Sequence, residues 1–415
     1  MNKKLSTLLY VISLPFLFTL SLQAQDTVKV MCYNLENYTP ADTSRNAYFR
    51  TILSEIKPDI LVVEEITSQA AVDIFLNNVL KSFNSNYSTG TFIANTYSSL
   101  DSTNNAIFLK NDKFNFIINT AIHTPGIRDI NAFKLEHKVT NQEVIVFGLH
   151  LKASQGVDNE IKRANGAASL RNFTDALSPG SYFMVVGDFN IYGSAESAYQ
   201  LLLITSGSNE GYFIDPININ GAWNNEIYAQ YHTQSTRSSS GGLDDRFDMI
   251  LYSHAISQPG GVYYVSNTII PYGNDGQHYN KSINDLPTNT AVSANIADAL
   301  YNASDHLPVY ASFEFSSATA VEEIINLPLA FSLSQNYPNP FNPGTVIKYS
   351  LSEAGHVELK IYNVLGQQIK TLVNEFKSAG NYQITFNAAG LNSGVYFYQI
   401  RTDNKILSKK MILLK

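Results

Sequence analysis

Several short apolar runs in this 415-residue chain end abruptly in an acid or an amide. Three of them are Val28–Tyr33 before Asn34, Ile60–Val63 before Glu64-Glu65, and Tyr182–Val186 before Gly187-Asp188. Continuous apolar runs of this length predict buried strands, and the ends of such strands are where layered α/β folds collect functional groups. The chain is therefore expected to place polar side chains from distant segments at one edge of a sheet.

Helical periodicity alternates with these runs. Phe49, Leu53 and Ile56 share a helix face that ends before Pro58, and Ser68 precedes an apolar stripe at 72–80. Further helices are expected at 159–177 and 195–203, and further strands at 106–109, 133–139, 144–151, 247–252, 262–270 and 309–315. The polar segment 206–242 is predicted to form long loops. The alternation predicts a layered mixed α/β domain.

The amino terminus has the pattern of a secretory signal peptide. Two lysines precede an apolar run from Leu8 to Leu20, and Leu22-Gln23-Ala24 offers a cleavage site, so residues 1–24 are expected to be removed. A membrane anchor is the alternative, but the run is short and contains Pro15. No later segment is apolar for long enough to predict a transmembrane helix.

Composition and charge narrow the class of protein. Hydrophobic residues make up 44% of the chain and charged residues only 15%, which is typical of a globular protein. The net charge of −7 argues against a protein that coats nucleic acid, although a nuclease with a local basic patch remains open. Cys32 is the only cysteine, so an intramolecular disulfide is excluded and the protein must rely on its core.

The composition and the predicted secondary structure change after Phe315. Residues 316–332 resemble a linker in composition, and a Pro-rich stretch, Tyr337 to Pro343, then leads into strand signals only. These strands are expected at 346–351, 356–364, 368–373, 381–386, 395–401 and 406–414, with turn residues between them. Short strands at this spacing predict a small β-sandwich. We expect a first domain at 25–315 and a second at 333–415.

An acid and a histidine stand together in Ser304-Asp305-His306-Leu307-Pro308-Val309, where a strand should begin. Hydrolysis of a phosphodiester needs a base for water, donors for the developing negative charge and usually a divalent metal ion. Asp305-His306, together with Glu65 and the Asp188-Phe189-Asn190 segment, could supply these groups. A single acid or amide after a strand more often closes a turn, so the hypothesis depends on the set.

Taken in order, these motifs resemble those of the endonuclease/exonuclease/phosphatase superfamily. The matching segments are Asn34, Pro58–Glu65, His150-Leu151, Gly187–Asn190, Arg246–Ile250 and Ser304–Val309. The resemblance implies a four-layered α/β sandwich of two mixed sheets flanked by helices. It also implies a metal-dependent hydrolase that acts on phosphate esters.

The resemblance implies a metal site of oxygen ligands. Glu65 would bind Mg²⁺, or Mn²⁺ or Ca²⁺ in its place, and Asp305 would add to the metal environment. Asn34 would help to hold metal or phosphate. Oxygen ligands suit a hard cation, and the sequence has no Cys/His cluster that favours zinc. Glu64 competes with Glu65 for the role of ligand, and strand parity favours Glu65.

The resemblance also implies roles for the remaining motif residues. Asp188 would orient or deprotonate the attacking water, and Asn190 would hold a phosphate oxygen. His306 would contact the scissile phosphate, polarised by Asp248. His150 matches a second histidine that faces the leaving group in the deoxyribonuclease and sphingomyelinase branches. The deoxyribonuclease branch places an acid beside that histidine, whereas this chain has Ser-Thr-Asn-Asn at 102–105. A structural role for His150 therefore remains an alternative.

Basic residues after His150 have two interpretations. Lys152, Lys162, Arg163 and Arg171 could attract a polyanionic substrate, with Lys152 nearest the motif, or they could form a solvated helix face. The other histidines have no motif support and are expected to be surface or loop residues: His123, His137, His232, His254, His278 and His356.

The C-terminal segment has a resemblance of its own. Residues 336–343, 359–366, 391–397 and the basic end at 409–415 resemble the sorting domain of type IX secretion substrates. This implies that the type IX machinery is a partner and that the protein is released or attached to the outer cell surface. A carbohydrate-binding or adhesive β-sandwich is the alternative.

Together these features predict a secreted, metal-dependent phosphodiesterase that degrades extracellular DNA or RNA. A sphingomyelinase-like phospholipase C or an inositol-phosphate phosphatase would use the same chemistry on another substrate. An inactive domain kept as a surface binding module is an alternative of a different class, and it predicts damage to the catalytic set. No oligomeric state follows from the sequence.

Overall fold

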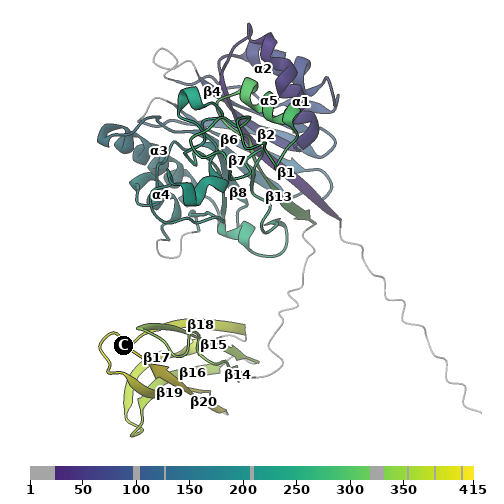
Figure 1. The fold of residues 1–415 in the computed structure, drawn as a ribbon. Helices are drawn as coiled ribbons and strands as arrows, with labels where there is room; N and C mark the ends of the chain where they lie inside the picture. Colours follow the sequence, from purple (N-terminus) through teal and green to yellow (C-terminus); the bar gives the residue numbers. More distant parts are fainter. Residues whose placement is uncertain are drawn as a thin grey trace, which may run out of the picture. The chain divides into compact units, whose positions relative to one another are not determined.

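The computed structural model describes residues 24–96, 103–125, 128–205, 210–317, 331–352, 355–377, 380–402 and 405–415. Contacts divide the chain into two compact units, Met1–Ala318 and Thr319–Lys415 (Figure 1). Most of the expected signal peptide (1–23) and linker (318–330) lies outside the described residues. Among the helices that the structure describes, none has the length and hydropathy needed to span a bilayer.

Two mixed β-sheets face each other in the first unit (Figure 1). In the described chain the first sheet has the order β11-β13-β1-β2-β4-β3, with β12 beside β13, and the second has the order β5-β6-β7-β8-β10-β9. The first sheet contains β1 (Gln25–Tyr38), β2 (Ile60–Ile66), β3 (Tyr87–Thr89), β4 (Asn104–Lys110), β11 (Val262–Tyr264), β12 (Ile270–Pro271) and β13 (Val309–Ser316). The second contains β5 (Phe114–Ile122), β6 (Ile130–His137), β7 (Glu143–His150), β8 (Phe183–Asp188), β9 (Phe213–Ile214) and β10 (Asp248–Ser253).

Alternating apolar side chains on the strands form separate cores on the two faces of each sheet. On β1, Val28, Val30 and Cys32 belong to the core between the sheets. Met31 and Tyr33 belong to the core under the outer helices, as expected for successive residues of a strand. The continuous apolar runs of the sequence are therefore strands that are buried on both faces.

Helices cover the outer face of each sheet, so the described part of this unit has four layers. α1 (Asn46–Ile56), α2 (Gln69–Phe75) and α5 (Ala294–Ala303) pack on the first sheet, and α3 (Val157–Asp175) and α4 (Ser197–Leu203) pack on the second. This arrangement confirms the predicted four-layered α/β sandwich of two mixed sheets flanked by helices.

Local sequence explains where the first two helices begin and end. α1 ends at Lys57, whose φ of 53° is left-handed, because the residue before Pro58 cannot easily continue a helix. α2 begins after Ser68, whose side chain accepts a hydrogen bond from the Ala71 N–H at 3.2 Å. A π-helical turn, Leu76–Leu80, extends α2 and keeps its apolar stripe buried.

At one end of the sheets the strands carry polar residues, and the side chains of these residues keep the alternating directions of the apolar residues before them. Asn34, Glu64, His150, Asp188 and Asp248 occupy the positions that face the layer between the sheets. β1 and β2 are parallel, as are β7 and β8, and β10 runs antiparallel to β8 with Asp248 opposite Asp188. These five residues therefore share one edge of the inter-sheet layer.

Several elements differ from the sequence-based expectations. β3, β5, β9 and α5 form where the sequence suggested no strand or helix, and β9 lies within the segment 206–242 that was expected to be loops. The strand expected at 262–270 is split into β11 and β12. The split occurs because the chain leaves the sheet at Val265–Ile269, where Asn267 has a φ of 62°. β5 escaped detection because only one of its faces is buried and asparagines interrupt its pattern.

The second unit is a small antiparallel β-sandwich. One sheet has the order β14-β15-β18 and the other β17-β16-β19-β20. Its strands are β14 (Ser332–Leu333), β15 (Gly344–Leu351), β16 (Gly355–Asn363), β17 (Gln368–Lys377), β18 (Gly380–Asn387), β19 (Gly394–Arg401) and β20 (Ile406–Leu413). The two sheets enclose a core that includes Ile347, Leu359 and Tyr398. The predicted all-β domain is confirmed.

Candidate active site

One buried carboxylate, that of Asp188, lies at the centre of a polar cluster. The side-chain amide of Asn34 donates to Asp188 Oδ2 at 3.2 Å and to Glu65 Oε1 at 3.1 Å. The same Asp188 oxygen lies 3.4 Å from Nε2 of His150 and 3.8 Å from Nε2 of His306. Five of the residues selected from the sequence therefore come together, from β1, β2, β7, β8 and the loop before β13.

The surroundings of Asp188 make its carboxylate more basic. Burial raises the pKa of Asp188, and the negative charges of Asp248 and Glu65 raise it further, while His306 opposes them. A carboxylate whose pKa is raised towards neutrality accepts a proton from water more readily than an exposed one.

Glu64 and Glu65 occupy different environments. Glu64 is fully buried between the sheets, and neither of its carboxyl oxygens has a hydrogen-bond partner among the described residues, so burial raises its pKa well above the usual range. Glu65 has a φ of 57°, which turns it out of the strand alternation. Its carboxylate, 18% exposed, accepts from the Asn34 amide and from the Asn37 N–H at 2.9 Å. Of the two, only Glu65 is open to a ligand, at the exposed edge of the cluster, which we call the mouth.

His306 and Asp248 form a hydrogen-bonded pair. His306 Nδ1 donates to Asp248 Oδ2 at 2.8 Å, which leaves Nε2 facing the cluster. Burial lowers the pKa of His306, but the charges of Asp248 and Asp188 outweigh it and hold the pKa well above its ordinary value. The backbone of Asp248 is fixed in turn, since its N–H donates to Thr233 Oγ1 at 3.1 Å.

His150 has the opposite character. Burial lowers its pKa well below the ordinary value, and the positive charges of Arg128, His306 and Lys152 lower it further. Its Nδ1 has no hydrogen-bond partner among the described residues. No carboxylate therefore polarises His150 from behind, in line with the amide-rich sequence at 102–105.

Asn190 and Arg128 meet at the carbonyl oxygen of Leu151, just after β7. Asn190 Nδ2 donates to this oxygen at 3.3 Å, and Arg128 Nη1 donates to it at 3.0 Å. The backbone N–H of Asn190 donates to Asp188 Oδ1 at 3.0 Å, and its φ of 50° is one that Asn tolerates well. Asn190 is thus held next to the central carboxylate.

Ser304 connects the C-terminal motif to the first strand. Its hydroxyl donates to the Asn34 carbonyl at 2.7 Å and accepts from the His306 N–H at 3.2 Å. Asp305 lies between these residues in sequence, and its charge helps to raise the pKa of His306.

The basic residues after His150 fit neither interpretation fully. Arg163 is buried and pairs with Glu196, and Arg171 pairs with Asp175 at 3.1 Å, so these two are structural ion pairs rather than a substrate surface or a solvated face. Lys152 is half-buried and close enough to His150 to lower its pKa. Of the set, Lys152 is the residue that the structure brings to the site.

The expectation that the other histidines are surface or loop residues is wrong for His137, which is buried at the end of β6, whereas His232 and His278 lie in loops but are buried there. His137, His232 and His278 are buried, because each ring is satisfied by hydrogen bonds within the protein. His137 contacts Asp26 at 3.0 Å, His232 contacts the Trp223 carbonyl at 2.8 Å, and His278 contacts Asp275 at 2.9 Å. The sequence around a single histidine does not reveal hydrogen-bond partners that lie far away along the chain.

The donors at the mouth suit a hard cation. Glu65 supplies carboxylate oxygen atoms, and Asp305 is next to His306 in sequence. Asn34 turns its amide N–H towards Glu65, while its oxygen accepts from the Glu36 N–H at 2.9 Å. Among the described residues, no group of three or more His, Cys, Asp or Glu side chains is arranged to hold a metal ion on its own. Mg²⁺ commonly binds through one or two carboxylates and keeps several waters, so the residues present fit Mg²⁺ better than a metal that needs a full protein cage.

Sequence patterns missed several residues of the site. Thr233 and Gln234 come from the segment expected to be loops, and Gln234 Nε2 lies 3.1 Å from His306 Nε2. Arg237 binds both carboxylate oxygens of Glu36 beside the motif of β1, at 2.7 and 2.9 Å. None of these residues follows an apolar run, so only the three-dimensional arrangement reveals them.

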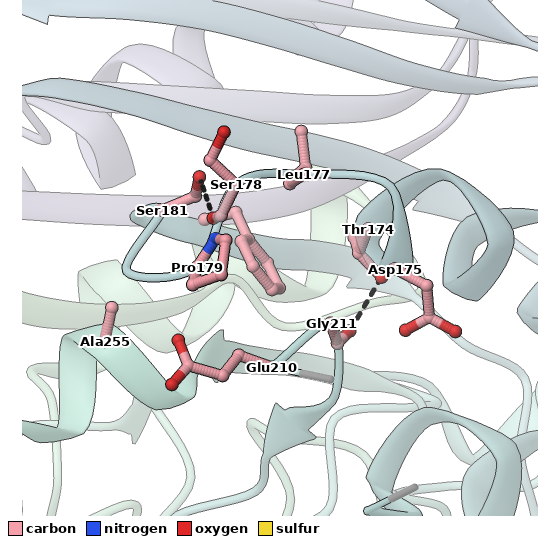
Figure 2. Close-up of a pocket in the computed structure, with 10 residues that line it drawn as sticks. Thr174, Asp175, Leu177, Ser178, Pro179, Ser181, Glu210, Gly211 and Ala255 are labelled. Carbon is pink, nitrogen blue, oxygen red and sulfur yellow. Dashed lines mark hydrogen bonds between the residues drawn. The ribbon is translucent and has the colours of Figure 1, made fainter. Parts of the chain in front are cut away.

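A separate cavity of about 250 Å³ lies beside Phe183 at the amino end of β8, whereas Asp188 is at the other end of this strand. Figure 2 shows the residues that line the cavity. Its polar groups are paired with one another: Thr174 donates to the Gly211 carbonyl at 2.7 Å, and Glu210 accepts from the Gly180 N–H at 2.8 Å. The cavity contains none of the motif residues, and we assign it no role.

Replacing Gly187 with Ala should destabilise the first unit. Gly187 has a φ of 135°, and a Cβ there would lie 2.1 Å from the Leu149 carbonyl oxygen and 2.8 Å from Glu64 Oε1. The backbone conformation alone costs roughly 1–3 kcal/mol for a residue with a side chain, and the clash adds to it. Urea unfolding followed by fluorescence of the single tryptophan, Trp223, measures the loss.

Gly156→Ala is the matched control, because Gly156 has a φ of 107° but open space around its Cβ position. It should be less destabilising than Gly187→Ala. Equal losses in the two variants would mean that the close packing around Gly187 has no energetic importance.

The chain matches two family models. The model of the Endonuclease/Exonuclease/phosphatase family matches residues 31–306, and the model of the Secretion system C-terminal sorting domain matches residues 335–414. Enzymes of the first family hydrolyse phosphate esters and generally use divalent metal ions. The sorting domain directs export by type IX secretion, followed by release or attachment at the cell surface. No curated protein has a matching sequence.

Solved structures with similar folds include TDP2 from D. rerio complexed with a single strand DNA product (15% identity, TM-score 0.45, covering 69% of this chain and 98% of that one). The human Nocturnin catalytic domain with bound sulfate has 18% identity and a TM-score of 0.46, covering 71% of this chain and 97% of that one. A family protein from Bacteroides thetaiotaomicron has 17% identity and a TM-score of 0.43, covering 70% and 99%. On the match over residues 31–306, the chain belongs to the endonuclease/exonuclease/phosphatase family.

Proposed function

We propose that this protein is a secreted, divalent-metal-dependent phosphodiesterase whose substrate is extracellular DNA or RNA. One observation carries the proposal: Asn34 joins the carboxylates of Glu65 and Asp188, and His150 and His306 approach the same Asp188 oxygen. Such a cluster has what phosphodiester hydrolysis requires, namely a base, hydrogen-bond donors and oxygen ligands for a cation.

In this proposal Asp188 orients the attacking water and accepts its proton, while Asn190 holds a phosphate oxygen. The water oxygen bonds to phosphorus and the ester P–O bond breaks. His306 contacts the phosphate through Nε2, because Asp248 occupies Nδ1 at 2.8 Å. His150 faces the leaving oxygen as a neutral imidazole, consistent with its lowered pKa.

Substrate and cation would bind at the mouth beside these groups. Glu65 and Asn34, with Asp305 nearby, would hold Mg²⁺, and Mn²⁺ or Ca²⁺ are the alternatives. When bound, the cation would neutralise part of the negative charge on the phosphate. Asn34 and Lys152 would add contacts to the substrate phosphates, Lys152 through its charge.

A lipid substrate would favour exposed aromatic side chains on a membrane-facing loop, and Tyr263, Tyr264 and Tyr272 are candidates for such side chains. The ring of Tyr264 instead packs on Phe313 at 5.8 Å, and that of Tyr272 packs on Tyr310 at 6.3 Å. Because two of these three rings pack within the fold, we favour nucleic acid over sphingomyelin or another lipid.

An inactive binding module would be expected to have lost part of the cluster. The candidate catalytic groups are all present and lie at one edge of the inter-sheet layer, and the pKa values of Asp188, His306 and His150 are shifted by their surroundings. Burying so many ionisable groups is costly, and active sites are where such costs are commonly retained. We therefore favour an enzyme over a binding module.

The purified full-length chain should cut DNA or RNA when Mg²⁺ is present. Chelation with EDTA should stop the cleavage, and added Mg²⁺ should restore it, because the mouth carries oxygen donors that suit this ion. Single-stranded DNA, double-stranded DNA, RNA and sphingomyelin are compared in parallel, with product formation as the measurement. Cleavage of sphingomyelin alone, or cleavage unaffected by EDTA, would contradict the proposal.

A further inference from the structure

Gln234 places a side-chain amide next to the one free ring nitrogen of His306. Gln234 Nε2 lies 3.1 Å from His306 Nε2, whereas Nδ1 of the same ring is engaged by Asp248 at 2.8 Å. The closest approach of the Asp188 carboxylate to His306 Nε2 is longer, at 3.8 Å. The amide is therefore the nearest hydrogen-bonding group to the nitrogen that faces the cluster.

The backbone around Gln234 is held on two sides. On one side Leu307 N–H donates to the Thr233 carbonyl at 2.7 Å, and Thr236 N–H donates to the Asp305 carbonyl at 3.0 Å. On the other side Gln234 N–H donates to the Asp245 carbonyl at 3.2 Å. This segment lies between the chain that carries His306 and the chain that leads to Asp248. The side chain of Gln234 is thus presented to His306 from a fixed backbone position.

We infer that Gln234 is a phosphate-binding residue of this site, which donates a hydrogen bond from its side-chain amide to a non-bridging oxygen of the scissile phosphate. The inference rests on the proposed function, in which His306 Nε2 contacts that phosphate. A phosphate that reaches His306 Nε2 comes within reach of an amide 3.1 Å from the same nitrogen.

The chemistry of an amide suits this position. When His306 carries a proton on Nε2, the Gln234 N–H groups do not donate to that nitrogen, so one of them can donate to an oxygen of the phosphate that the same Nε2–H contacts. The amide carries no charge, so it adds none to a site where the carboxylates of Asp188, Asp248 and Asp305 already act on His306. A donor aimed at an oxygen whose negative charge grows during the reaction stabilises the transition state more than the substrate.

Two variants distinguish the loss of the hydrogen-bond donor of Gln234 from a change in the shape of its side chain. Gln234→Met keeps the length of the side chain but removes the N–H groups, and kcat/KM for a DNA or RNA oligonucleotide should fall by about 100-fold. Gln234→Glu keeps the shape and places a carboxylate against the phosphate, so the loss should be larger still. Gln230→Met, an exposed residue on the preceding 3-10 turn Glu226–Tyr231, should keep wild-type activity.

A phosphorothioate substrate distinguishes direct contact from a purely structural role. The two diastereomers of a dinucleotide phosphorothioate place sulfur at one or the other non-bridging position. If Gln234 donates to one of these oxygens, wild type should discriminate between the diastereomers more strongly than Gln234→Met does. A structural role would lower the rates for both diastereomers by the same factor, and this result would overturn the inference.

Binding of inorganic phosphate tests the residue without turnover. In calorimetry with Mg²⁺ present, Gln234→Met should bind phosphate about 10-fold more weakly than wild type, and Gln230→Met should match wild type. If wild type cuts no nucleic acid yet shows this difference, the proposed substrate is wrong and the role of Gln234 stands. Equal affinities in wild type and Gln234→Met, or no phosphate binding by wild type, would refute the role of Gln234.

Discussion

Asp188→Asn should lower kcat/KM for the nucleic acid substrate by about 10³-fold or more, while leaving the fold intact. The change replaces a carboxylate that is 2% exposed and lies within 3.8 Å of Asn34, His150 and His306 by an amide of the same shape. An amide cannot take the proton of the attacking water, and removal of one such group typically costs 10²–10⁴ in rate. Hydrolysis assays under saturating Mg²⁺ measure the loss.

The thermal midpoint of Asp188→Asn should equal or exceed that of wild type. The folded state raises the pKa of Asp188 above its unfolded value of 3.8, so the charged form destabilises the protein at neutral pH. A neutral side chain removes this cost. Asp158→Asn, on the exposed first turn of α3, is the matched control and should change neither rate nor stability. Turnover close to that of wild type in Asp188→Asn would exclude this residue as the base.

Arg246→Met should destabilise the first unit by about 3–5 kcal/mol, because it leaves a buried carboxylate without its partner. Arg246 makes two hydrogen bonds to Asp215, at 2.8 and 2.9 Å, and both side chains are almost fully buried. Tyr199 donates to the same carboxylate at 2.6 Å. The Arg246 guanidinium lies 5.1 Å from the ring of Trp223, so the fluorescence of this single tryptophan reports unfolding of the unit in urea.

Two controls separate the ion pair from packing. The double variant Arg246→Met/Asp215→Leu removes both charges and should regain most of the lost stability, since well-packed apolar residues often replace a buried pair at little cost. Arg50→Met, on α1, should change stability by less than about 0.5 kcal/mol. If the double variant is as unstable as Arg246→Met, the loss comes from packing and not from the unpaired charge.

The effect of Arg246→Met should also depend on pH. The pair holds the pKa of Asp215 below its unfolded value of 3.8, so its stabilisation is present above pH 3.8 and is lost as pH falls below that value. The difference in stability between wild type and Arg246→Met should therefore be largest near neutral pH and narrow in acid.

Strand patterns in the sequence predict most of this fold and the edge where the site lies. The runs before Asn34, Glu65 and Asp188 are buried on both faces, so their strands and their ends are visible without any tertiary information. Strand parity does not separate Glu64 from Glu65 correctly, because the alternation places Glu64 on the face that carries Asn34 and Asp188. Glu65 reaches Asn34 only because its φ of 57° turns it out of the alternation. Convergence at one edge follows from the parallel pairing of such strands.

Other elements depend on contacts that no local pattern encodes. β5 lies at the edge of its sheet, so one face is polar and the alternation is weak. α5 follows a stretch rich in Asn, Thr and Ser, and its identity comes from Ser293, which caps it, and from the apolar core that it covers. Short elements of this kind are stabilised by their neighbours more than by their own propensity.

The supporting residues of the site were the least predictable part. Gln234 and Thr233 belong to a polar segment whose position is set by pairing with Asp245 on one side and with the chain around His306 on the other. Such pairing joins residues far apart in the sequence. A composition rich in Ser and Gly suggests only a loop, so these contacts become visible only in three dimensions.

The pairing of β1 with β13 has a consequence for synthesis and export. Residues 25–32 lie against residues 309–316, so the strand that opens the catalytic unit is flanked by the strand that closes it. A nascent chain that has already displayed Asn34, Glu65 and Asp188 still lacks His306 and leaves one edge of β1 unpaired. If His306 acts as we propose, a chain truncated before β13 should be inert, and hydrolysis should begin only after this last strand has been synthesised and has paired with β1.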